Sequence, residues 1–134
     1  YAARPEVGAV VHTHSPRATA LAAAGRGIPP FHYMIALAGG AIRCMPYATF
    51  GSEALAQAAL AGLWRRRAVL LANHGVVAVG ATPARAQAVA VEVENLAGQY
   101  LDLLAAGLEP QLLSEAELAS VIARFADYGR LDPA

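Results

Sequence analysis

Two short apolar runs in this chain lead almost directly into a hydroxyl residue followed by proline, and this arrangement constrains the fold most strongly. Residues 7–11 precede Ser15-Pro16, and residues 76–79 precede Thr82-Pro83. The apolar runs favour β-strands. Ser or Thr at the N-cap, with proline at the first helical position, is a typical helix start. A chain that passes from strand to helix in this way is predicted to form a mixed α/β layer domain.

The remaining elements follow from similar signals. The first helix is expected from Pro16 to about Ala24, ending at Gly25, while residues 31–38 are ambiguous between a short helix and irregular chain. The other expected elements are, in chain order, a strand at 42–45, a helix at 53–63 capped by Ser52, strands at 68–72 and 76–79 that are close enough to pair as a hairpin, a long helix after Pro83, and a last helix that starts at a capping box of Ser114 and Glu117.

Composition argues against several classes of protein. The 134 residues fit one domain, and the net charge is zero without a basic stripe, so no nucleic-acid partner is expected. No uncharged apolar run approaches the ~20 residues of a spanning helix, so no membrane partner is expected either. The single cysteine, Cys44, excludes an internal disulfide framework and suits a reducing cytoplasm. Because the chain begins at Tyr1 and enters a strand-like run almost at once, we expect that an N-terminal portion is missing.

Three of the four histidines stand at the ends of predicted strands. His12 and His14 are two residues apart, so their side chains point to one face of a strand, and His74 ends another apolar strand. Three neutral imidazoles leave a coordination position for water or substrate, as in a catalytic zinc site. From the residues alone, a metal site and incidental histidines both remain open. The fourth histidine, His32, is interpreted as packing or hydrogen bonding.

The segments around these histidines resemble a known family. Residues 9–15 (Ala-Val-Val-His-Thr-His-Ser) and 73–75 (Asn-His-Gly) resemble the metal-binding signatures of the class II aldolase/adducin family. Other segments resemble the L-fuculose-1-phosphate aldolases within that family, namely residues 28–35, 46–51, 92–101 and 125–129. The resemblance covers essentially all of residues 1–134 and implies a single domain that corresponds to the C-terminal two-thirds of the family domain. It also implies a three-layer α/β/α fold with a mixed, largely antiparallel central sheet.

The same resemblance implies a reaction. His12, His14 and His74 would be the ligands of one Zn2+ per subunit. The enzyme would reversibly cleave a sugar phosphate such as L-fuculose 1-phosphate to dihydroxyacetone phosphate and L-lactaldehyde, through an enediolate that the metal stabilises. The chain has no lysine, which argues independently against the Schiff-base route to the same products.

Further roles come from the resemblance alone. Tyr33 would place a catalytic hydroxyl near the aldehyde, and Phe50 would form an apolar wall of the substrate pocket. Tyr128 would be a second catalytic residue, on a C-terminal tail that reaches the site of a neighbouring subunit. The family also implies a homotetramer with active sites between subunits.

Two departures and several alternatives accompany this interpretation. The family's acid/base glutamate and its phosphate-binding loops lie upstream of the segment that matches Tyr1, and Glu6 does not align with that glutamate. L-ribulose-5-phosphate 4-epimerase, or another sugar-phosphate lyase of the same fold, is the nearest alternative. A non-catalytic, adducin-like interaction domain is the second. A bare α/β domain with incidental histidines is the third.

Overall fold

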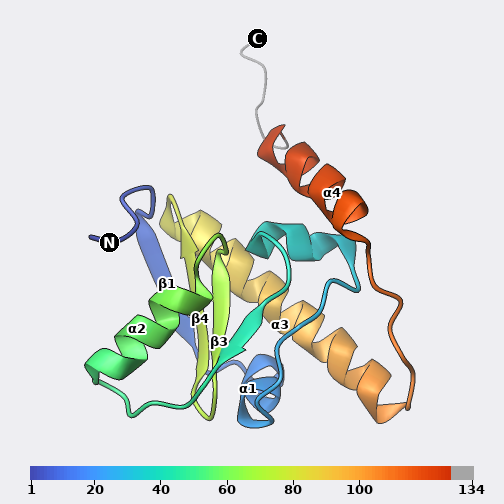
Figure 1. Ribbon diagram of the computed structural model, residues 1–134, viewed down its shortest axis with the longest axis horizontal. Coiled ribbons are helices and arrows are strands. Elements are labelled where there is room, and N and C mark those ends of the chain that lie inside the picture. The colour runs from blue at the N-terminus through green and yellow to red at the C-terminus, as the bar shows by residue number, and fades with distance from the viewer. Residues whose placement is uncertain (128–134) are drawn as a thin grey trace.

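A four-stranded sheet forms the middle of the molecule in the computed structural model, which describes residues 1–127 (Figure 1). Its strands lie in the order β1-β4-β3-β2. The central strand β4 pairs antiparallel with both β1 and β3, whereas β2 pairs parallel with β3. The expected mixed, largely antiparallel sheet is therefore confirmed. The strand bounds are Ala9–Thr13 for β1, Arg43–Met45 for β2, Ala68–Leu71 for β3 and Gly75–Gly80 for β4.

Helices cover both faces of this sheet, which confirms the three-layer α/β/α arrangement. Helices α1 (Pro16–Ala23) and α3 (Pro83–Ala105) pack on one face, and α2 (Glu53–Gly62) packs on the other. The side chains of β3 point alternately to the two faces of the sheet. Because helices cover both faces, the strand is buried along its whole length. Leu70 faces α1 and α3, while Val69 faces α2.

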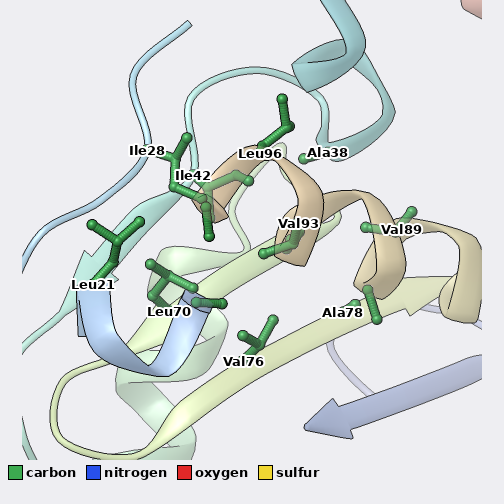
Figure 2. Packing of buried hydrophobic residues seen from close by; sticks show 14 of the residues in the cluster. Leu21, Ile28, Ala38, Ile42, Leu70, Val76, Ala78, Val89, Val93 and Leu96 are labelled. Carbon is green, nitrogen blue, oxygen red and sulfur yellow. The ribbon is translucent and has the colours of Figure 1, made fainter. Parts of the chain in front are cut away.

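The larger hydrophobic core lies between the sheet and helices α1 and α3. Figure 2 shows Leu21 of α1 and Val93 of α3 beside the sheet residues Leu70 and Val76. All four side chains are at most 1% exposed. This packing fixes α1 and α3 relative to the strand ends where the histidines stand.

The helix starts agree with the sequence, and only the side-chain cap of α1 differs. The Thr82 and Ser52 hydroxyls accept backbone N–H groups at the starts of α3 and α2, and Ser114 and Glu117 form the expected capping box at α4 (Glu115–Asp127). Helix α1 begins at Pro16 as predicted, but the Ser15 side chain makes no capping hydrogen bond. Ser15 therefore occupies the N-cap position as expected, but another acceptor takes the place of its hydroxyl.

The ambiguous segment forms a short 3-10 helix, η1 (Tyr33–Ala38), which ends at Gly39 with a φ of 82°. His32 stands at its N-cap, where its Nδ1 accepts the N–H of Met34 at 3.2 Å, so the hydrogen-bonding interpretation of His32 is confirmed. Helix α4 packs against η1 (Figure 1). Over the described residues, we find no helix with both the length and the apolar character that crossing a membrane requires.

Candidate metal centre

Three imidazole rings converge at one end of the sheet. His12 lies in β1, His14 directly follows that strand, and His74 lies in the turn that joins β3 to β4. The distance between His12 Nε2 and His14 Nε2 is 3.0 Å. One nitrogen from each of the three rings lies within 4.8 Å of the others. His12 and His14 are exposed and His74 is half-buried, so a small molecule can reach the cluster from solvent.

Strand pairing brings together residues that are about sixty positions apart in the sequence. In the register of β1 and β4, Thr13 lies opposite Val76, so the end of β1 meets the start of β4. His74 immediately precedes β4 and therefore arrives beside the other two rings. The turn before it contains Asn73 with a φ of 56°, a left-handed conformation that asparagine tolerates better than most residues. The Asn73 N–H donates to the Ala22 carbonyl of α1 at 3.2 Å.

A hydrogen bond to the backbone fixes the tautomer of His12. Its Nδ1 lies 2.7 Å from the carbonyl oxygen of Val76. A carbonyl can only accept, so Nδ1 carries the proton and the lone pair of Nε2 faces His14. A metal-binding histidine typically donates its other ring N–H in this manner.

The donors suit a transition-metal cation. Two imidazole nitrogens 3.0 Å apart repel each other through their lone pairs unless a proton or a cation lies between them. A divalent ion such as zinc, which imidazole nitrogens favour, relieves this repulsion at all three rings. The observed donor set therefore fits the metal that the sequence predicted, and the assignment of the three ligands stays a prediction.

The pKa of His74 supports its availability as a ligand. Burial lowers this pKa below the ordinary value of 6.5, and the neighbouring His12 and His14 lower it further. A lowered pKa keeps the ring neutral to lower pH, and only the neutral ring offers a lone pair to a metal.

Gly75 is a site residue whose role sequence reasoning missed. A Cβ at this position would overlap the carbonyl oxygen of Thr13 and would lie 2.9 Å from Cδ2 of His14. The start of β4 thus approaches the end of β1 too closely for any side chain. The sequence shows Gly75 in the Asn-His-Gly segment. The need for a glycine there, however, arises from contact with β1, which is distant in sequence.

Glu94 is a second residue that sequence reasoning missed. Its Oε1 accepts the N–H of Arg17 at 2.8 Å, and its Oε2 accepts the N–H of Ala18 at 2.9 Å. This carboxylate on α3 therefore caps α1 in place of the Ser15 side chain.

Among residues 1–127, neither Tyr33 nor Phe50 makes a ring contact with the three histidines. Tyr33 lies on η1, 53% exposed, with its ring 6.3 Å from that of Phe125 on α4. In Figure 1, η1 (teal) lies level with the upper end of the sheet, whereas the β3–β4 turn lies at its lower end. Phe50 is 81% exposed in the loop between β2 and α2. Tyr128 lies outside the described residues.

An α/β/α domain with three convergent imidazoles at a strand end defines a candidate metalloenzyme class, and comparisons with known proteins give the family. The model of the "Class II Aldolase and Adducin N-terminal domain" family matches residues 1–101. The chain belongs to this family, whose class II aldolases depend on a metal.

Three similar proteins illustrate the relationship. A 5-methylthioribulose-1-phosphate/5-deoxyribulose-1-phosphate aldolase of Rhodospirillum rubrum is 52% identical over 96% of this chain and 58% of its own length. An L-fuculose phosphate aldolase of Haemophilus influenzae is 45% identical over 96% of this chain and 60% of its own. A solved L-fuculose 1-phosphate aldolase superimposes with a TM-score of 0.83 at 38% identity, over 87% of this chain and 55% of the other. The chain thus spans about three fifths of the length of these curated relatives.

The close approach at Gly75 generates a testable prediction. We expect Gly75→Ala to weaken metal binding by about tenfold or more, because the added Cβ displaces the strand end that carries His14. The same overlap should reduce the free energy of unfolding by about 1–3 kcal/mol. Isothermal titration with Zn2+ and chemical denaturation measure the two effects.

Gly98→Ala is the matched control. Its Cβ would lie 3.7 Å from Cγ of Arg17, which is ordinary contact, and alanine is favoured over glycine within a helix. Zinc affinity should be unchanged in this variant. Unchanged affinity in Gly75→Ala as well would contradict the close approach as a determinant of the site.

Proposed function

We propose that this chain carries the metal centre of a class II aldolase that reversibly cleaves a ketose 1-phosphate to dihydroxyacetone phosphate and an aldehyde. The observation that carries the proposal is the convergence of His12, His14 and His74 at an exposed strand end. Membership of a family that contains metal-dependent aldolases supports it. The named activities of the similar proteins are all cleavages of ketose 1-phosphates.

In this proposal the three histidines hold one Zn2+. The metal supplies Lewis acidity, which polarises a carbonyl group and stabilises the negative charge that develops beside it. His12 is oriented for this task by its bond to the Val76 carbonyl, and the exposure of His12 and His14 gives the substrate access.

The aldehyde half of the substrate distinguishes two candidates. Cleavage of L-fuculose 1-phosphate gives L-lactaldehyde, whereas 5-deoxyribulose 1-phosphate gives acetaldehyde. The 52% identity to an aldolase named for 5-methylthioribulose and 5-deoxyribulose 1-phosphates favours the second candidate over the 45% of the fuculose enzyme. All of these sugars end in a methyl or methylthio group. An apolar wall such as Phe50 suits that end of the substrate.

The proposed roles of Tyr33 and Tyr128 involve a second copy of the chain. Tyr33 begins η1, which precedes the start of β2, whereas His74 follows the end of β3, which runs parallel to β2. A neighbouring subunit therefore offers a route by which the Tyr33 hydroxyl could meet a metal centre. We therefore propose that active sites form between subunits of a homotetramer, with Tyr33 and Tyr128 as catalytic hydroxyls. The exposed ring of Tyr33 supports this reading.

The metal assignment is tested by removing one ligand. His12→Ala should lose bound zinc and aldol cleavage together, because two imidazoles bind zinc much more weakly than three. Elemental analysis measures the bound zinc, and a coupled assay for dihydroxyacetone phosphate measures the cleavage. Both use the full product of the gene that encodes this chain. His32→Ala is the control, since His32 caps η1 and should leave zinc in place. Zinc retained at parental stoichiometry in His12→Ala would refute the ligand assignment.

The substrate is tested by direct comparison. We expect a higher kcat/KM for 5-deoxyribulose 1-phosphate than for L-fuculose 1-phosphate, with both cleaved, because the two share the ketose 1-phosphate half. Conversion of L-ribulose 5-phosphate without cleavage of either sugar would instead identify the epimerase. Absence of both zinc and activity would point to the adducin-like interaction domain.

The intersubunit roles are tested by mixing two variants. Tyr33→Phe should lower kcat by about a hundredfold, as for loss of a general acid or base, and should keep zinc because the ring remains. His12→Ala chains lack the metal but retain Tyr33. Mixed oligomers of the two should recover part of the activity, because some sites combine an intact metal centre with an intact Tyr33. Failure to recover in oligomers shown to be mixed would contradict a site built from two chains. Tyr128→Phe chains, expected to be slowed with zinc retained, allow the same test for the tail.

A further inference from the structure

The position of His14 depends on a very short connection. Only His14 and Ser15 separate the last residue of β1, Thr13, from the first residue of α1, Pro16. The strand side of this connection is fixed by the pairing of Thr13 with Val76. The direction of the His14 ring therefore depends on how firmly the first turn of α1 is held on the other side.

The first turn of α1 has unusual capping needs. The first four N–H groups of a helix find no partner within it, and proline at the first position removes one of them. The next two N–H groups, of Arg17 and Ala18, both donate to the carboxylate of Glu94, one to each oxygen. The Ser15 side chain makes no capping bond. A single carboxylate from another helix thus satisfies the start of α1 and also matches the positive end of its dipole.

Glu94 is itself held by the hydrophobic core. Its neighbours on α3, Val93 and Ala97, are at most 1% exposed and pack in the cluster shared with Ala18 and Leu21 of α1. The carboxylate is therefore anchored on a rigid surface rather than on a loop. A chain of contacts runs from this core through Glu94 and the first turn of α1 to His14.

From these contacts we infer that Glu94 is a positioning residue for the histidine cluster, which fixes His14 at the metal by clamping the start of α1. The inference rests on the proposed metal-binding function. It assigns Glu94 no contact with metal or substrate. Thr82 caps α3 in a comparable manner, but no histidine of the cluster adjoins that cap. Comparing variants of the two caps therefore distinguishes an effect on the position of His14 from a general loss of helix stability.

The test compares Glu94→Gln with Thr82→Ala, both loaded with Co2+, whose visible absorption reports the number and geometry of its ligands. The amide of Gln keeps the shape of Glu but has one acceptor oxygen, so one of the two N–H groups loses its partner. We expect about a tenfold rise in the Co2+ dissociation constant for Glu94→Gln, with an altered spectrum. Thr82→Ala should lower the melting temperature by loss of a cap, with the parental dissociation constant and spectrum.

Each result decides the question. Parental affinity and spectrum in folded Glu94→Gln overturn the positioning role while the metal site stands. Equal loss of affinity in Thr82→Ala also overturns it, since general destabilisation would then explain the effect. A parent chain that binds no Co2+ overturns the metal function and the role of Glu94 with it. If Glu94→Gln fails to fold, Glu94→Asp takes its place. Asp keeps the charge but is one methylene too short to reach both N–H groups, so the same rise in the Co2+ dissociation constant is expected. Parental affinity and spectrum in Glu94→Asp would likewise overturn the positioning role.

Discussion

The antiparallel pairing of β1 with β4 is the interaction on which the rest of the structure depends. It places Thr13 opposite Val76, and at this point the two backbones are so close that only glycine fits at position 75. The same contact gives Nδ1 of His12 a carbonyl acceptor and delivers His74 beside it. On the buried face of β4, Val76 and Ala78 form the floor of the core beneath α3. One strand pair therefore serves both folding and the candidate metal centre.

The candidate site is supported on one side by the hydrophobic core and is exposed to solvent on the other. The nitrogen lone pairs of three imidazoles within 4.8 Å of one another repel unless a proton or a cation lies between them. Their convergence is maintained by strand pairing on one side and by the carboxylate clamp at the start of α1 on the other. Such preorganisation reduces the reorganisation that metal binding would otherwise require. The rings remain accessible because they stand at strand ends, outside the packed layers.

Local signals in the sequence predicted most elements, because caps, prolines and apolar periodicity act within a few residues. They left open whether the three histidines form one site, and the family resemblance supplied that set. What was missed depends on contacts between distant segments. Ser15 carries the signature of a cap, yet Glu94, 77 residues beyond Arg17, takes the bonds. No local sequence pattern predicts that a glutamate on one helix caps another helix. The roles of Tyr33 and Phe50 came from family resemblance, and the geometry of one chain neither places Tyr33 at the histidines nor assigns it a function.

The separation of Tyr33 from the histidines divides the proposed function into two parts with different physical requirements. Metal binding requires only the three histidines and the contacts that hold them, all of which lie within one chain. Cleavage of a sugar also requires groups that handle protons and the aldehyde, and in the proposal Tyr33 supplies one such group from a neighbouring subunit. Metal affinity therefore follows the stability of the β1–β4 and α1–α3 contacts. In the proposal, turnover also depends on oligomerisation. A kcat that depends on protein concentration, together with a metal affinity that does not, would then indicate a site shared between subunits.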